Sequence, residues 1–381
     1  MLHFSRRGFL RNTLGAAWTG ATLLEQSVFR AAAARAQAPG AATALFDIEK
    51  VADGIYAAIA RPQTLLNCNA AIFVNSHDVL VVDTHSKPSA VAALVAQIKK
   101  EVTPKPVRYV VNSHFHWDHS QGTPAYRKLA PGAQVVASTA TRRLLAANGS
   151  KRLADSMELT RKNLEDAKSK LGSASAADKT YYQRTISEMT AYLKEMQGYT
   201  PELPTVTFDK TLVIQDAGHD LLLAFRGRAH TAGDVAVFCP QKKVIATGDV
   251  LHGFMPYMGD AYPLEWPRTL YGWAEFGFDH IIPGHAAVQH SRDRLYHMGA
   301  YIEEVTEAVV KGKKDGKSVE QLQQTITPKT LATLNRNGYG SFAAASIAKF
   351  TVTPPGTTAE EILATAVKTN VMHTFAALDR G

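Results

Sequence analysis

The sequence predicts an α/β layered fold on the strength of three observations. Short apolar runs with strand character alternate with segments whose apolar residues recur at helical spacing. The chain has 381 residues, 45% hydrophobic and 20% charged, which allows a sizeable core and excludes a disordered, collagen-like or coiled-coil chain. A cluster of histidines directly follows one strand, where sites on α/β sheets form. No uninterrupted apolar run reaches about 18 residues, so we expect no stable membrane span.

The strand-like runs in the first part of the chain are short and end in turns or polar residues. They are residues 55–59, 70–74, 79–82, 107–111 and 134–137. The turn 75–78 joins the second and third of these runs, and residues 89–101 have apolar side chains at helical spacing. We therefore expect three strands, a helix and two further strands.

Residues 139–198 interrupt this alternation because they are polar, favour helix and contain few β-branched residues. Apolar residues recur there in two stretches, separated by Gly172-Ser173-Ala174-Ser175. These residues are Leu153, Met157, Leu164 and Leu171 in the first stretch and Tyr182, Ile186, Met189, Leu193 and Met196 in the second. The pattern predicts an inserted hairpin of two long helices that packs over the core or projects from it.

Strand-like runs resume near residue 205 and are followed by helices. The expected strands are 212–214, 221–225, 235–238, 244–246 and 281–282, and the expected helices are 266–276, 291–311, 318–336 and 358–378. No linker separates two domains. We expect one main domain over residues 39–290, which contains the hairpin, and a C-terminal helical extension over residues 291–381 packed on that domain.

The first 38 residues resemble a targeting segment. Ser5-Arg6-Arg7-Gly8-Phe9-Leu10 is similar to the twin-arginine export signal, a weakly apolar run follows at 14–29, and Ala36-Gln37-Ala38 has the form of a cleavage site. The resemblance implies a signal peptide over residues 1–38, the twin-arginine translocation machinery as a partner and a periplasmic location. The alternative is a basic amphipathic helix at the N-terminus.

Charge and cysteine content exclude several function classes. Without residues 1–38 the chain has 37 basic and 33 acidic residues, a net charge of about +4 that gives no reason to expect nucleic acid as a partner. Cys68 and Cys239 are the two cysteines, which excludes a disulfide-rich scaffold and a four-cysteine metal site. Each lies in or beside a strand-like run, so we expect both to be buried small apolar residues.

The segment with the clearest chemistry is His114-Phe115-His116-Trp117-Asp118-His119. His114 and His116 point the same way in an extended chain, whereas Asp118 and His119 are adjacent and need a turn to face a shared centre. Imidazole combined with carboxylate suits zinc, iron or manganese. The segment therefore predicts a metal site at the end of the strand 107–111.

This H-x-H-x-D-H pattern resembles the signature of the metallo-β-lactamase superfamily. The superfamily pattern continues with a histidine after one strand, an aspartate after another and a histidine after a turn. His230, Asp249 and His285 follow in that order, the last of them in Pro283-Gly284-His285. The resemblance covers roughly residues 46–290. It implies an αββα sandwich with metals at one edge of the two sheets, and it makes residues 39–290 the catalytic domain.

The resemblance also implies a ligand set for two divalent ions, with zinc preferred over iron and manganese. His114, His116 and His230 would hold the first ion, Asp118, His119 and His285 the second, and Asp249 would bridge them. The ions would lie about 3.5–4 Å apart and share a water that attacks the substrate as hydroxide. Asp118 is the candidate catalytic residue, because it would also orient this nucleophile or transfer a proton.

Four further residues have weaker claims, each with a structural alternative. Asp83 resembles a recurring superfamily aspartate that supports a ligating histidine from behind, but it would equally cap a turn. His85 and His252 are expected to contact substrate or to be structural. Tyr257, with neighbours such as Met258, is expected to wall the pocket or to belong to the core.

Asp249 separates subclasses within the resemblance. The class B β-lactamases with the best-known zinc sites have cysteine or serine at this place, whereas an aspartate resembles glyoxalase II, acyl-homoserine lactonases and phosphotriesterases. The expected function is therefore a periplasmic binuclear hydrolase of a small ester, lactone, lactam or related electrophile, with an ester or lactone preferred over a β-lactam. The alternatives are an iron-dependent redox member of the superfamily and a non-catalytic metal-binding maturation factor.

Overall fold

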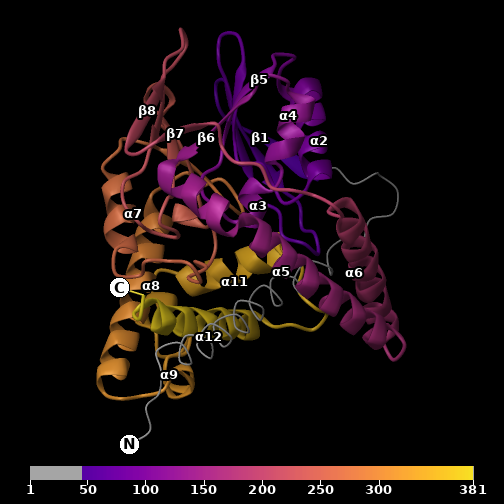
Figure 1. Cartoon of the computed structure of the whole chain (residues 1–381). Helices are drawn as coiled ribbons and strands as arrows, with labels where there is room; N and C mark the ends of the chain where they lie inside the picture. The colour runs from indigo at the N-terminus through magenta and orange to yellow at the C-terminus, as the bar shows by residue number, and fades with distance from the viewer. Residues whose placement is uncertain (1–44, 381) are drawn as a thin grey trace, which may run out of the picture.

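The computed structural model describes residues 45–380, so the expected targeting segment lies outside the described residues. Two β-sheets pack face to face and helices cover both outer faces (Figure 1). This arrangement is the αββα sandwich, and the predicted fold class is confirmed. The boundaries proposed for the main domain and the C-terminal extension stay predictions.

The first sheet contains seven strands in sequence order. They are β1 (Phe46–Ala52), β2 (Ile55–Ala60), β3 (Ala70–Val74), β4 (Val79–Val82), β5 (Val107–Val111), β6 (Gln134–Ser138) and β7 (Val206–Phe208). The pairs from β1 to β4 are antiparallel and those from β4 to β7 are parallel. Strand β1 is an addition to the sequence prediction.

The second sheet contains five strands in the order β12-β11-β10-β9-β8. They are β8 (Thr211–Ile214), β9 (Leu221–Ala224), β10 (Ala236–Cys239), β11 (Val244–Gly248) and β12 (His280–Pro283). Its pairs are antiparallel except β11 with β12, which is parallel. Parallel pairing places the carboxyl ends of β11 and β12 at the same edge of the sheet.

Three layers of buried side chains hold the sandwich together. Because strand residues alternate between faces, Leu80 and Val82 of β4 enter the layer between the sheets, while Val79 and Val81 enter the layer under the helices. Helices α2 (Pro88–Gln97) and α4 (Thr123–Leu129) cover the first sheet. The outer face of the second sheet is covered by α7 (Trp266–Ala274), α8 (Asp293–Lys314), α11 (Tyr339–Phe350) and α12 (Ala359–Ala377).

The inserted hairpin consists of α5 (Thr139–Leu171) and α6 (Ala176–Glu195), which pack against each other. Ser138 and Ser175 cap the two helices by accepting hydrogen bonds from backbone N–H groups. The buried residues of α6 differ from those predicted for the second apolar stretch of the hairpin. Tyr181, Thr185 and Tyr192 are buried, whereas the predicted Tyr182 and Leu193 are half-buried. The buried stripe of α6 is rotated because this helix also packs on the body of the protein, where Tyr181 contacts Val352.

The C-terminal helices also depart from the prediction. The expected helix 318–336 is two short helices, α9 (Val319–Thr325) and α10 (Ala332–Asn335). Pro328 lies between them, where its missing N–H and its ring are incompatible with a continuous helix. Helix α11 was not predicted. Among residues 45–380, no helix is both long and apolar enough to cross a membrane.

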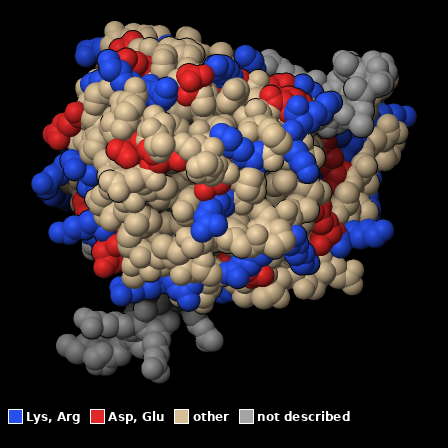
Figure 2. Space-filling view, turned by 90° about the horizontal axis from the view of Figure 1, so that it is seen from above, with Lys and Arg blue, Asp and Glu red and all other residues tan. Residues whose placement is uncertain are grey.

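Basic and acidic side chains are interspersed over the face shown in Figure 2. Among the described residues, that face has no extended patch of one charge.

Candidate metal centre

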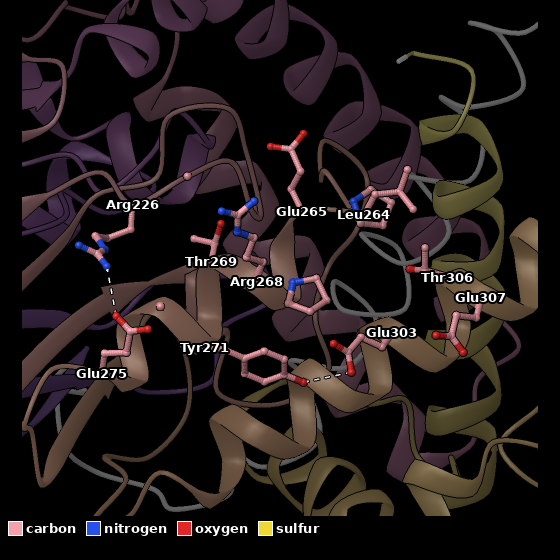
Figure 3. Close-up of a pocket in the computed structure, with 14 residues that line it drawn as sticks. Arg226, Leu264, Glu265, Arg268, Thr269, Tyr271, Glu275, Glu303, Thr306 and Glu307 are labelled. Atoms are coloured by element: carbon pink, nitrogen blue, oxygen red, sulfur yellow. Dashed lines mark hydrogen bonds and ion pairs between the residues drawn. The ribbon is translucent and has the colours of Figure 1, made fainter.

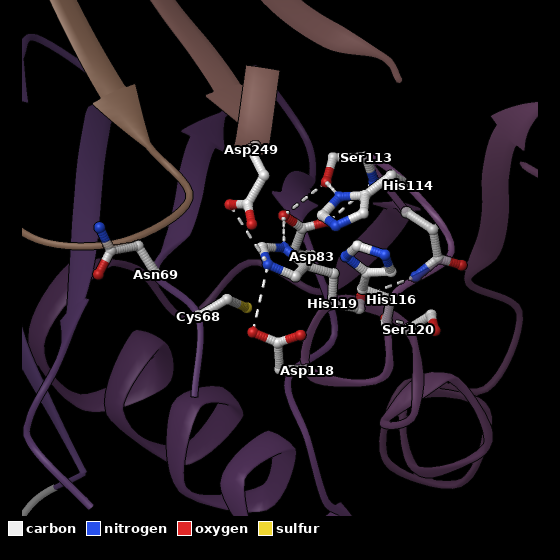
Figure 4. Close-up of polar contacts among 12 residues, drawn as sticks. Cys68, Asn69, Asp83, Ser113, His114, His116, Asp118, His119, Ser120 and Asp249 are labelled. Carbon is white, nitrogen blue, oxygen red and sulfur yellow. Dashed lines mark hydrogen bonds and ion pairs between the residues drawn. The ribbon is translucent and has the colours of Figure 1, made fainter. Parts of the chain in front are cut away.

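The candidate ligands lie in loops at one edge of the two sheets, where several strands end. The loop after β5 carries His114 and His116 and continues into α3 (Trp117–Ser120), whose first turn carries Asp118 and His119. His230 lies between β9 and β10, Asp249 follows β11 and His285 follows β12. The structure therefore brings together seven residues that are distributed over residues 114–285 of the sequence. Figure 4 shows Asp249 with the four candidate ligands of the loop after β5 and of α3.

The first ligand set is a group of three buried histidines, His114, His116 and His230, whose ligand nitrogens lie within 4.8 Å of one another. The Nε2 atom of His230 is 2.9 Å from Nδ1 of His116. The Nε2 atom of His114 is buried and has no hydrogen-bond partner among the described residues. A buried nitrogen without a partner costs free energy, and a cation bound to all three nitrogens would remove that cost.

The second ligand set is Asp118, His119 and His285, which also lie within 4.8 Å of one another. The Nε2 atom of His119 is 3.3 Å from Nε2 of His285 and 3.4 Å from the carboxylate of Asp118.

Asp249 lies between the two sets. One carboxylate oxygen is 3.5 Å from His119, and the other is 3.5 Å from both His230 and His285. The first oxygen, Oδ1, has no hydrogen-bond partner among residues 45–380. This is the place that a bridging carboxylate needs, so the residues present fit the expected pair of ions. Metal binding by the seven residues stays a prediction.

Asp83 supports two of the candidate ligands from behind. Its carboxylate accepts hydrogen bonds from His119 Nδ1 (2.7 Å) and from the backbone N–H and hydroxyl of Ser113 (2.8 and 2.9 Å). The hydroxyl of Ser113 is in turn 2.9 Å from Nδ1 of His114. A carboxylate on Nδ1 selects the tautomer whose Nε2 is free to bind a metal. These contacts favour the supporting role over a turn cap.

The other two histidines of the first set also have outer partners. His230 donates from Nδ1 to the backbone oxygen of Tyr257 at 2.9 Å. His116 donates from Nε2 to Asp260 at 2.8 Å, and Arg152 lies 2.6 Å from the same carboxylate oxygen. Asp260 and Arg152 are residues that sequence reasoning missed, because neither belongs to a motif and they lie 144 and 108 positions from their respective partners.

His252 and Tyr257 lie beside the cluster. The Nε2 atom of His252 is 3.3 Å from Asp249, and its ring packs on that of His285 with centroids 4.6 Å apart. It therefore completes a third possible ligand group with Asp249 and His285. The ring of Tyr257 makes edge contacts with His116 and His230 and is half-buried, so it walls the cluster. Met258, in contrast, belongs to the core under the second sheet.

Cys68 and His85 form a buried pair behind the second ligand set. The sulfur of Cys68 is 3.4 Å from Nδ1 of His85, and both side chains have no exposed surface. Cys68 also lies within 4.8 Å of possible ligand atoms of Asp83 and His119, so it is more than the apolar residue that was expected. Cys239 is buried between the sheets.

Burial and neighbouring charges together control the protonation of the site histidines. Burial and the neighbouring histidines hold the pKa of His114 and of His230 well below the ordinary value, so both imidazoles are neutral near pH 7 and able to bind a cation. Burial also lowers the pKa of His85 to about 3. Burial opposes the protonation of His119, but the charges of Asp118 and Asp249 raise its pKa well above the ordinary value. The carboxylates of Asp118 and Asp249 therefore favour a positive charge at the second set.

The family model of the metallo-beta-lactamase superfamily matches residues 64–298, which is well over half of the chain. This protein belongs to the metallo-beta-lactamase superfamily. The matched residues include all seven candidate ligands and the inserted hairpin. The match confirms the family predicted from the histidine motif.

Three solved structures are similar to this chain. A metallo-beta-lactamase from Pontibacter korlensis is 18% identical, with a TM-score of 0.50 over 68% of this chain and 99% of that chain. The metallo-beta-lactamase DIM-1 is 19% identical (TM-score 0.48, 68% and 97% covered), and VMB-1 is 18% identical (TM-score 0.49, 68% and 98% covered). The first of these likenesses supports the fold alone.

A surface cavity of about 790 Å³ lies apart from the candidate ligands (Figure 3). Residues of α7 and α8 line much of it, and none of the seven candidate ligands does. Charged groups of both signs line the cavity. Two of its pairs interact with each other: Arg226 forms an ion pair with Glu275, and the hydroxyl of Tyr271 donates a hydrogen bond to Glu303. We assign it no role in the chemistry of the cluster.

Proposed function

We propose that this protein is a hydrolase that uses two divalent ions, preferably zinc, to cleave a small ester or lactone. The observation that carries this proposal is the arrangement of seven buried candidate ligands in two sets that share Asp249. When bound, two ions would lower the pKa of a water molecule to about 7 and polarise the substrate oxygen.

The side chains around the ions have separable roles in this proposal. Asp118 is buried, and its carboxylate is 3.4 Å from both His119 and His285. It is therefore placed to hold the nucleophilic water and to pass its proton to the leaving group. The negative charge of Asp249 would offset the two cations, which otherwise repel each other strongly in a buried site.

The surroundings of Asp118 support an uncharged electrophile. Trp117, its neighbour, packs on a small apolar cluster formed by Leu65 and the hairpin residues Leu153, Tyr192 and Met196. This cluster adjoins Asp118 through Trp117, and none of its members carries a charge. An apolar wall favours the hydrophobic part of an ester or lactone.

The proposed function is tested by assaying zinc-loaded protein against p-nitrophenyl esters, lactones, a cephalosporin and a phosphotriester, with the metal-depleted protein as control. We expect the highest kcat/KM on an ester or lactone, and loss of turnover on chelation. Bound iron without hydrolysis would favour the redox alternative. Bound metal without turnover on any compound would favour a maturation factor.

We further propose that the protein is exported to the periplasm by the twin-arginine machinery, on the basis of Arg6 and Arg7. Changing both to lysine is expected to leave the precursor in the cytoplasm, because the machinery recognises the arginine pair. Cell fractionation and immunoblotting measure the distribution. The matched control is Arg11→Lys, which removes an arginine outside the pair and should leave export unchanged. Processed protein in the periplasm with both arginines replaced would contradict the proposal.

A further inference from the structure

Helix α5 of the inserted hairpin contacts two of the loops that carry candidate ligands. At its N-terminus, the hydroxyls of Ser138 and Thr141 donate to the backbone oxygen of Gly233, at 2.6 and 2.9 Å, in the loop that carries His230. Further along, Arg152 reaches the Asp260 carboxylate and lies over the ring of Phe115, with its guanidinium carbon 4.5 Å from the ring centroid. The insertion is therefore in contact with the metal centre.

Asp260 accepts hydrogen bonds from both sides. One carboxylate oxygen receives Nε2–H of His116 and the guanidinium of Arg152. The carboxylate of Asp260 therefore links His116 of the first set to Arg152 of α5. The C-terminal end of the chain holds the same loop, because Arg380 donates to the backbone oxygens of Gly259 and Ala261 at 3.0 Å.

The position of Arg152 on its helix is fixed by packing. Its neighbour Leu153 is buried in the apolar cluster with Leu65 and Tyr192. The Arg152 side chain is 31% exposed and that of Asp260 is 26% exposed, whereas His116 is 9% exposed. The ion pair thus stands at the boundary between solvent and the buried histidines, where it also shields His116.

We propose that Asp260 and Arg152 are positioning residues of the metal centre, which makes helix α5 a functional part of it. Asp260 fixes the tautomer of His116 and turns Nδ1 towards the other two histidines of the first set. Arg152 keeps the carboxylate in that orientation. A carboxylate behind a ligating imidazole also raises the basicity of the nitrogen that binds the metal. This inference rests on the proposed metal centre.

The test measures the affinity of each zinc ion by competition with a chromophoric chelator, together with the visible spectrum of the cobalt-substituted protein. Asp260→Ala is expected to weaken the first ion about 10- to 100-fold, and Asp260→Asn less, because an amide oxygen still accepts from His116. Arg152→Ala should weaken it by up to about tenfold. The cobalt spectrum should change in each variant, because the orientation of a ligating imidazole changes.

Two further variants separate positioning from a general effect on the helix. Arg152→Lys should restore most of the affinity. The double variant Arg152→Ala, Asp260→Ala should be no weaker than Asp260→Ala alone, because both residues act through His116. The matched control is Lys151→Ala, which removes the adjacent cation that pairs with Asp155 on the surface of α5 and should leave affinity and spectrum unchanged.

The outcomes distinguish this inference from the proposed function. If the wild type binds two ions and hydrolyses its substrate while Arg152→Ala and Asp260→Ala keep its affinities and cobalt spectrum, the inference is wrong and the proposed function stands. If Lys151→Ala weakens the first ion as much as Arg152→Ala does, the inference is also wrong. If the wild type binds no metal, both fall.

Discussion

The Asp249→Asn variant is expected to lose its second metal ion and at least about a hundredfold in turnover. The carboxylate lies 3.5 Å from His230 of the first set and 3.5 Å from His119 and His285 of the second. Asparagine keeps the size but has one good oxygen donor and no charge, so two nearby dications would repel each other more strongly. The first ion should remain, because three histidines still hold it.

Zinc stoichiometry by mass spectrometry and turnover on the best substrate of the panel decide this prediction. Asp216→Asn is a suitable control, since that carboxylate pairs with Ser76 outside the cluster. We expect the melting temperature of Asp249→Asn to fall much less than its activity, because the sheets and their buried layers are unchanged. Two tightly held ions with near-normal turnover would mean that Asp249 is not a bridge. The reason to prefer an ester or lactone over a β-lactam as the substrate would then be lost.

The His116→Ala variant is expected to hold about one ion or less and to lose at least about a hundredfold in turnover. The substitution removes one of the three nitrogens of the first set. It also removes the hydrogen bond between His116 and the carboxylate of Asp260, which keeps its contact with Arg152. Because the two sets share Asp249, weak binding of the first ion also disturbs the second.

Metal content and kcat/KM are again the measurements, and His77→Ala is the control because His77 is exposed and belongs to no motif. Circular dichroism would verify that both variants are folded. Wild-type metal content in His116→Ala would remove His116 from the site and would also remove the reason to propose a role for Asp260.

The sequence allowed the α/β class and most of the strands to be predicted, because strands buried on both faces are nearly continuous apolar runs, as in β4. It did not reveal β1, because buried and exposed residues do not alternate regularly along this strand. It also did not reveal which side of α6 is buried. That side depends on what α6 packs against, and the partner surface comes from distant residues such as Leu65 and Val352. Local spacing carries no information about such a partner.

The candidate ligands could be selected from sequence because four of them lie within six residues, at the end of a strand, and the rest follow in a characteristic order. Sequence alone therefore determined which residues are candidates for holding a metal and which family to expect. Among the supporting residues, Asp83 was named from the sequence, whereas Asp260 and Arg152 were decided by the tertiary structure. A single aspartate at 260 or arginine at 152 has no pattern of its own, and each acquires a role only when folding brings α5, the loop after β11 and the loop after β5 to one edge of the sandwich.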